Sequence, residues 1–107
     1  MLSPRAPLVT IIIPAFNEEG NIGRLIEETY AAVPETMLGE VIVVDDASDD
    51  GTGSEIKALI PRYDSLRYMR HGRRAGQSAA LRTAVLAARF PAIAAMDGDG
   101  QNDPHDI

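Results

Sequence analysis

The sequence predicts an α/β fold in which a parallel β-sheet carries helices on both faces. Short apolar segments rich in β-branched residues alternate along the 107 residues with segments whose apolar side chains recur at helical spacing. Strand–helix alternation of this kind is typical of a parallel sheet with right-handed crossovers. Because the last crossover is expected to reverse the winding direction, the strand order should be 3-2-1-4, with a crevice between strands one and four.

Four segments are expected to form the strands. Residues 8–13 are almost continuously apolar, which favours a strand buried on both faces, and Pro14 is expected to stop it. Residues 40–44 form a second segment of this type. Residues 66–69 are a weaker third strand, and the short run 92–96 is the fourth.

Three helices are expected between these strands. The first occupies residues 22–33, and the second is a short helix that ends at Pro61. The third is expected to start near Gln77, and its apolar residues between positions 81 and 88 give an alanine-rich face suited to close packing on a sheet. Residues 103–107 look like the first turn of one more helix, and a single domain is expected to fill residues 1–107.

Composition narrows the class of protein. The chain is 45% hydrophobic and 24% charged, which is typical of a soluble globular domain. It has no cysteine, so it offers neither a disulfide nor a thiolate ligand. No apolar stretch approaches the roughly 20 residues that a membrane span needs, and no signal peptide is recognisable, so a cytoplasmic location is expected. A formal net charge of -6 argues against a nucleic-acid partner.

Two aspartates separated by one glycine follow the fourth predicted strand. Asp97 and Asp99 are at positions i and i+2, which point to the same side of an extended chain. Carboxylates this close repel one another unless a cation lies between them, and a hard divalent cation clamped to substrate phosphates is the usual solution. The alternative is a polar turn that caps a helix beginning near Pro104. His105 could approach a metal or phosphate there, but a solvated helix start is the simpler interpretation.

The loop after the first strand, residues 14–20, places an aromatic ring and a carboxylate beside a strand end. Phe16 could stack on a nucleobase while nearby groups bond to the edge of that base. Alternatively, Phe16 is a core residue beneath the loop.

The second strand ends in a pair of aspartates. Asp45 and Asp46 could reach a base N–H or ribose hydroxyls, as an acidic residue does in dinucleotide-binding folds. Ser48, Asp49 and Asp50 are expected to cap the following helix. A phospho-acceptor aspartate of a receiver domain is a competing hypothesis, although that fold has its acidic pair after the first strand.

An arginine-rich loop, residues 70–76, precedes the third predicted helix. Arg73 and Arg74 beside free amides of the helix N-terminus would make a binding site for a diphosphate or a phosphorylated acceptor. A solvated surface loop is the alternative. His71 has no histidine or cysteine partner for a zinc site, so a surface or hydrogen-bonded role is expected.

Four segments in this order resemble the family 2 glycosyltransferases of the GT-A fold. They are residues 9–19, 43–52, 74–81 and 96–104. The closest resemblance is to the polyprenyl-phosphate branch, which includes dolichyl-phosphate mannose synthase. It implies that the sheet is the Rossmann-like half of a GT-A domain. Gly100 departs from the pattern, because that branch often has an apolar residue there.

The resemblance also implies how a nucleoside-diphosphate sugar would be bound. The base and ribose would lie among Pro14, Phe16, Glu18, Val44 and Asp46. The diphosphate and a metal ion, Mg²⁺ or Mn²⁺, would be held by Asp97, Gly98, Asp99 and Gln101, with Asp99 as the principal metal ligand.

The reaction that the resemblance implies is an inverting transfer of the sugar from a UDP- or GDP-sugar to polyprenyl phosphate. That acceptor is already an anion and needs no general base. One alternative is a family 2 transferase acting on a polysaccharide or other hydroxyl acceptor, which would usually require a carboxylate base that the sequence does not reveal. A metal-dependent nucleotide-binding module without transfer activity is the other alternative.

Family catalytic domains continue well beyond the acidic turn. The chain is therefore expected to be the N-terminal, nucleotide-binding part of a truncated domain that transfers no sugar by itself. In the full-length protein this part would act at the inner face of the membrane. Residues 92–96 would lie at an open sheet edge with no charge or proline to block pairing, so self-association as a dimer is expected.

Overall fold

The computed structural model describes residues 8–96 of the chain. Strands and helices alternate along it, as the sequence predicts. In chain order the elements are β1 (Val9–Ala15), α1 (Ile22–Ala32), β2 (Leu38–Asp45), α2 (Thr52–Leu59), a 3₁₀ turn (Ile60–Arg62), β3 (Leu66–Arg70), α3 (Gln77–Ala87) and β4 (Ala92–Ala95).

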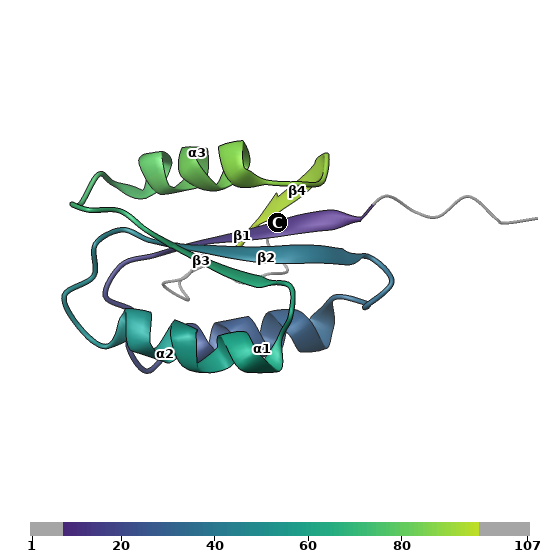
Figure 1. Ribbon diagram of the computed structural model, residues 1–107, viewed down its shortest axis with the longest axis horizontal. Helices are drawn as coiled ribbons and strands as arrows, with labels where there is room; N and C mark the ends of the chain where they lie inside the picture. The colour runs from purple at the N-terminus through teal and green to yellow at the C-terminus, as the bar shows by residue number, and fades with distance from the viewer. Residues whose placement is uncertain (1–7, 97–107) are drawn as a thin grey trace, which may run out of the picture.

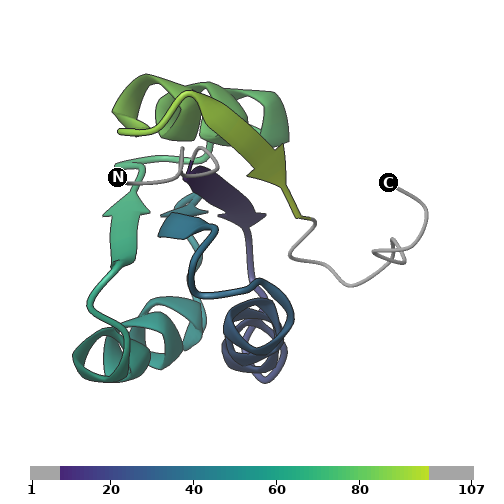
Figure 2. The ribbon, with the colours of Figure 1, turned by 90° about the vertical axis from the view of Figure 1, so that its right-hand side faces the viewer.

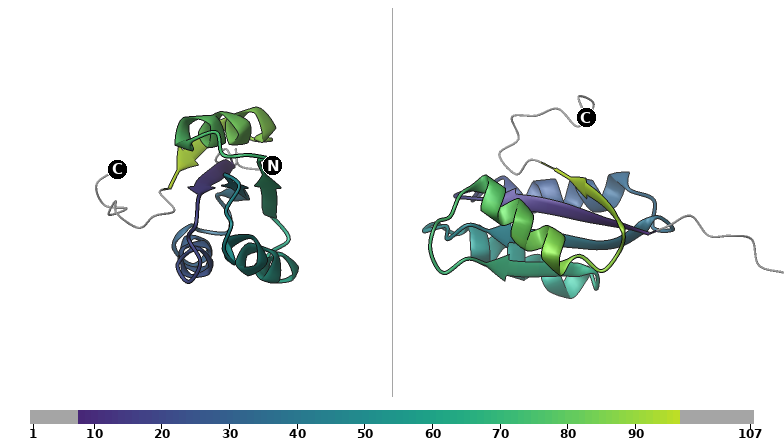
Figure 3. Two further views of the ribbon diagram at one scale, coloured as in Figure 1. Left: turned by 90° about the vertical axis from the view of Figure 1, so that its left-hand side faces the viewer. Right: turned by 90° about the horizontal axis from the view of Figure 1, so that it is seen from above.

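The four strands form one parallel sheet in the order β3-β2-β1-β4, so the predicted order is confirmed. Helices α1 and α2 cover one face of the sheet, and α3 covers the other (Figures 1 and 2). Seen from above, α3 runs across β1 and β2, the two central strands (Figure 3).

Two apolar layers result from the alternation of side chains along the central strands. Ile11 and Val41 point toward α1 and α2, whereas Ile12 and Ile42 point toward α3. All four are at most 5% exposed. The expected alanine face of α3 is confirmed: Ala80 and Ala84 are 1% exposed, and their small side chains allow the helix to approach the sheet closely. 

Pro14 lies inside β1, so the expectation that it stops the strand was wrong. The reason is the side of the strand that its nitrogen faces. Ala15 O accepts a hydrogen bond from the β2 side, at Asp46 N, and Ile12 O accepts one from the β4 side, at Met96 N. Because bonding direction alternates along a strand, the nitrogen of Pro14 faces the β4 side, beyond Ile12, the last residue of β1 that pairs with β4.

Strand β4 lies at one edge of the sheet in the described part of the chain. Its residues are mostly exposed, and Ile93 is 40% exposed. An exposed apolar edge invites pairing with another chain, so self-association stays a prediction. Light scattering of the purified chain tests it, and a monodisperse monomer at high concentration would contradict it.

Candidate functional site

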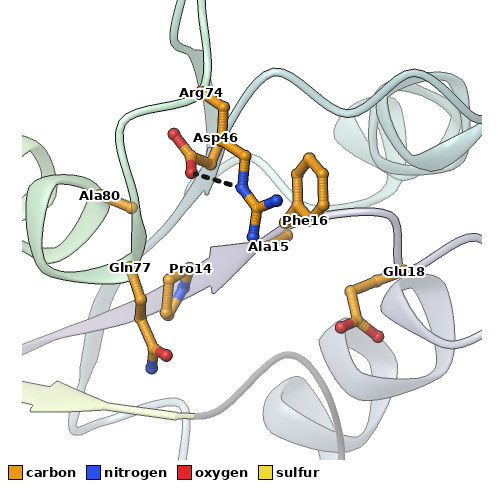
Figure 4. Close-up of a pocket in the computed structure, with 8 residues that line it drawn as sticks. All are labelled: Pro14, Ala15, Phe16, Glu18, Asp46, Arg74, Gln77 and Ala80. Carbon is orange, nitrogen blue, oxygen red and sulfur yellow. Dashed lines mark ion pairs between the residues drawn. The ribbon is translucent and has the colours of Figure 1, made fainter.

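A pocket of about 210 Å³ lies at the carboxyl ends of β1 and β2, beside the start of α3 (Figure 4). This is the edge of a parallel sheet where ligand sites lie. Four of the residues predicted to surround a nucleoside line it: Pro14, Phe16, Glu18 and Asp46. The predicted phosphate-binding Arg74 lines it too, as do three residues that the sequence analysis did not select: Ala15, Gln77 and Ala80.

Val44 and Arg73, two further predicted site residues, have other positions. Val44 is 1% exposed and packs in the layer under α3 with Ile12 and Ala80, and it does not line the pocket. Arg73 is exposed in the loop before α3 and is likewise not a lining residue. Phe16 is half-buried at the pocket wall, so it is not the core residue of the alternative interpretation.

Asp46 accepts three hydrogen bonds at the pocket, and its side chain is almost completely buried, with 3% of the residue exposed. Its Oδ1 accepts hydrogen bonds from Ala75 N and the His71 Nδ1–H, and its Oδ2 accepts one from Gly76 N, all at 2.8 Å. Burial alone would raise the pKa of Asp46, but the hydrogen bonds from His71 and the two amides outweigh it and lower the pKa. Asp46 is therefore a carboxylate that holds residues 71–76 around itself.

Asp45 has a different environment, which the sequence analysis did not anticipate. Neighbouring residues of a strand point to opposite faces, so Asp45 projects toward the α1 and α2 side. It is fully buried and accepts hydrogen bonds from the hydroxyl of Tyr68 and from Arg70 Nη1, both at 2.9 Å. Ser48 N donates to its other oxygen at 2.9 Å. With these partners Asp45 holds the end of β2 against β3, away from the pocket.

Glycine is required where the arginine-rich loop enters α3. Gly76 has φ of 100°, a conformation that side chains disfavour, and in it the amide of Gly76 points to Asp46. The helix begins at Gln77, close to the predicted start. The amides of Ala75 and Gly76, just before the helix, are bonded to Asp46, and an anion site at the free amides of the helix itself stays a prediction.

Arg74 covers the ring of Phe16. Its guanidinium carbon lies 3.9 Å from the centre of the ring, and its Nε lies 4.0 Å from Asp46 Oδ2. Figure 4 shows the guanidinium between the carboxylate and the ring. The Arg74 side chain is 66% exposed, so the contact is a solvent-facing wall of the pocket rather than a buried ion pair.

Hydrogen bonds join the loop after β1 to the loop after β2. Asn17 N donates to Ser48 Oγ at 2.9 Å, and Glu18 N donates to Thr52 Oγ1 at 2.8 Å. Ser48 therefore does not cap α2, contrary to expectation. Asp50 accepts hydrogen bonds from the amide and the hydroxyl of Thr52, at the start of that helix. The amide of Asp49 instead donates to Asn17 Oδ1 and so joins the two loops.

Three acidic residues in or beside these two loops, Glu19, Asp50 and Glu55 of α2, accept hydrogen bonds from backbone amides. Glu55 accepts from Gly20 N at 2.7 Å and from Gly23 N at 2.6 Å, at the start of α1. Glu19 accepts from Gly51 N at 2.7 Å. Within residues 8–96, no group of three or more histidine, aspartate or glutamate side chains could hold a metal ion. Glu19 and Glu55 thus have structural partners in the loops.

The predicted metal and diphosphate ligands Asp97, Gly98, Asp99 and Gln101 lie outside the described residues, as does His105. Their chemistry suits a hard divalent cation, because carboxylate and amide oxygens are the ligands that such ions prefer. The residue before them is placed: Met96 N donates to Ile12 O at 2.8 Å. The motif therefore begins one residue after Met96, which is hydrogen-bonded to Ile12 of β1. Ile12 in turn lies two residues before Pro14 of the pocket.

No helix in the described range 8–96 has both the length and the apolar character needed to cross a membrane.

The sheet order and the helices on its two faces agree with the nucleotide-binding half of the GT-A glycosyltransferase fold. A solved mannosyltransferase from Pyrobaculum calidifontis, in complex with GDP-Man and Mn²⁺, has the same fold with a TM-score of 0.79. It is 33% identical, and the match covers 87% of this chain and 28% of that one. Residues 10–107 match the family described as "Glycosyl transferase family 2". The chain belongs to glycosyltransferase family 2, as its motifs indicate.

Curated relatives support the polyprenyl-phosphate branch. Dodecaprenyl-phosphate galacturonate synthase from Rhizobium johnstonii is 41% identical over 101 residues, which are 92% of this chain and 30% of that protein. Undecaprenyl-phosphate 4-deoxy-4-formamido-L-arabinose transferase from Aeromonas hydrophila is 32% identical over 102 residues, 94% of this chain and 31% of the relative. The chain thus spans about 30% of the length of the curated relatives that it matches.

Proposed function

We propose that this chain is the nucleotide-sugar-binding part of a metal-dependent, inverting glycosyltransferase. The whole protein would move a sugar from a UDP- or GDP-sugar to polyprenyl phosphate. The observation that carries the proposal is the pocket at the carboxyl edge of β1 and β2, because four residues selected as nucleoside-binding line it together. The polyprenyl-phosphate acceptor is supported by the two relatives above, which are named for such acceptors.

The walls of the pocket suit a planar base with a charged tail. Phe16 and the guanidinium of Arg74 are two flat groups already in contact, and a nucleobase can stack on either. Arg74 and the exposed Arg73 supply positive charge beside the start of α3 for a diphosphate. Asp46 supports this wall, since its oxygens already bind three donors of residues 71–76.

A divalent cation, when bound, would neutralise the charge that develops on the nucleoside-diphosphate leaving group. Asp97, Asp99 and Gln101 are the residues that would hold it. The Mn²⁺ in the related mannosyltransferase supports a divalent ion of this type. The acceptor phosphate, already an anion, would attack the anomeric carbon from the face opposite the leaving group, so the pocket residues need only bind and orient the donor.

Binding of nucleotide to the 107-residue chain tests this proposal. Calorimetry with UDP and with GDP, each with and without Mn²⁺, should show binding that Mn²⁺ strengthens. Asp99→Asn should remove most of that Mn²⁺-dependent gain, about tenfold or more in affinity, because a charged ligand oxygen is lost. The matched control is Asp64→Asn, an exposed aspartate after the 3₁₀ turn, which should bind as the wild type does.

Equal Mn²⁺ dependence in the wild type and Asp99→Asn would exclude Asp99 as a metal ligand. Absence of nucleotide binding under all conditions would overturn the proposed function. The chain spans about 30% of its relatives, so we expect binding without sugar transfer, and turnover onto polyprenyl phosphate by this chain alone would contradict that expectation.

A further inference from the structure

His71 links the pocket to the helix behind it. It follows β3 directly, and its side chain is 16% exposed. Its Nδ1 lies 2.8 Å from Asp46 Oδ1, and its Nε2 lies 2.8 Å from the hydroxyl of Thr83, near the middle of α3. One imidazole ring therefore bridges the end of β2, the end of β3 and α3.

The partners determine which ring nitrogen carries the proton. Asp46 is ionised, since its pKa is lowered, and a carboxylate only accepts hydrogen bonds. Nδ1 must then be the protonated nitrogen. In the neutral ring, Nε2 has a free lone pair and accepts the hydrogen bond of the Thr83 hydroxyl. Asp46 thus keeps a proton on Nδ1, and the two polar neighbours together hold the ring in one orientation.

The loop of residues 71–76 connects His71 to the pocket. Asp46 accepts hydrogen bonds from His71 at one end of residues 71–76 and from the amides of Ala75 and Gly76 at the other. Both ends of the segment are therefore bonded to one carboxylate. Arg74 lies within the closed segment, and its guanidinium covers Phe16. Without the His71 side-chain contact, this end of the loop that carries Arg74 would keep its backbone hydrogen bond from His71 N to Asp45 O but lose its link to Asp46.

We propose that His71 is a positioning residue of the nucleotide pocket, which acts through Asp46 and Thr83 to hold Arg74 against Phe16. The ligand in this statement rests on the proposed function, whereas the effect of His71 on the loop does not. Sequence analysis missed this role because Asp46 lies 25 positions before His71 and Thr83 lies 12 positions after it. No local pattern joins them.

Two substitutions separate the two halves of the imidazole. An asparagine amide can place an N–H where Nδ1 lies, whereas a glutamine amide reaches the position of Nε2. His71→Asn should keep the contact with Asp46 and bind nucleotide within about threefold of the wild type. His71→Gln should lose that contact and bind about tenfold more weakly, as expected for one hydrogen bond to a charged group. Equal affinities of the two variants would overturn the proposal.

Two measurements need no nucleotide. Hydrogen exchange at the amides of Ala75 and Gly76 should be faster in His71→Gln and unchanged in His71→Asn. Unchanged exchange in His71→Gln would overturn the proposal even if nucleotide binds as proposed.

The second uses the wild-type protein, so it does not depend on a variant that folds. Nitrogen-15 NMR of the ring at neutral pH should show a protonated Nδ1, and an unprotonated Nδ1 would overturn the proposal. If the wild type binds no nucleotide, the proposed function fails, and these two measurements still decide the role of His71 in the loop.

Discussion

Two buried carboxylates lie near the two ends of β2, and they hold the two ends of α3. Glu40 is near the start of the strand and Asp46 directly follows its end, and each is only 3% exposed. Glu40 accepts a hydrogen bond from Arg89 N, just after α3, at 2.6 Å. Asp46 accepts from Gly76 N, just before α3, at 2.8 Å.

The remaining partners of the two carboxylates differ. Glu40 also binds Arg67 Nη1 at 2.7 Å and the Thr10 hydroxyl at 2.8 Å, and the same Arg67 atom donates to Ala87 O. Burial raises the pKa of Glu40, but the bonds from Arg89, Arg67 and Thr10 outweigh it and lower the pKa. Its partners therefore belong to the sheet and to the end of α3, far from the pocket in the fold.

Asp46, by contrast, is bonded mainly to a loop that forms a pocket wall. Burial and a lowered pKa therefore do not by themselves mark a functional carboxylate. What distinguishes Asp46 is that its partners include a segment, residues 71–76, whose Arg74 lines the pocket. Changes at Glu40 should alter stability alone, whereas changes at Asp46 should alter stability and nucleotide affinity together.

The largest effect is expected at Glu40. Glu40→Ala removes the acceptor of three donors and leaves Arg67, 27% exposed, with Ala87 O as its one hydrogen-bond acceptor among residues 8–96. Unfolding free energy should fall by about 3 kcal/mol, because a largely buried charge and two further donors lose their partner. Urea unfolding followed by circular dichroism measures this. Nucleotide affinity of the folded variant should equal that of the wild type, and a weakened affinity would show that Glu40 also affects the pocket.

Asp46→Asn should have the next largest effect. The amide keeps one oxygen, but its NH₂ group faces a backbone N–H or the His71 Nδ1–H, and donors repel. We expect about 1–2 kcal/mol of lost stability and about tenfold weaker nucleotide binding even without added metal. Glu40→Gln is the matched control: it makes the same chemical change at the other end of β2 and should leave affinity unchanged. An unchanged affinity in Asp46→Asn would place Asp46 with Glu40 as a structural residue.

Sequence could predict the sheet order and the edge where the pocket lies, because both follow from the alternation of strands and helices and from where each strand ends. It also selected Phe16 and Asp46 from their place after a strand. It could not predict that Asp45 and Asp46 separate to opposite faces with different partners, because all those partners except Ser48 lie 23 or more positions later in the chain. Glu40 showed no signal either, since a glutamate beside a strand start is ordinarily exposed.

The smallest effect on stability is expected at Arg74. This residue also tests most directly whether the loop held by Asp46 binds nucleotide. Its contacts with Phe16 and Asp46 are at the surface, where charge pairs contribute little. Arg74→Gln should therefore leave the urea midpoint close to that of the wild type and weaken nucleotide binding several-fold, because the planar cation is lost.

Arg74→Lys, which keeps the charge but not the flat group, should recover only part of the affinity if the wall binds a base by stacking. Full recovery with lysine would mean that charge alone matters. The control is Arg82→Gln, an exposed arginine on α3 that does not line the pocket. If Arg74→Gln binds nucleotide as tightly as Arg82→Gln does, the loop that Asp46 holds is not a nucleotide-binding wall. The difference between the two ends of β2 would then be one of structure only.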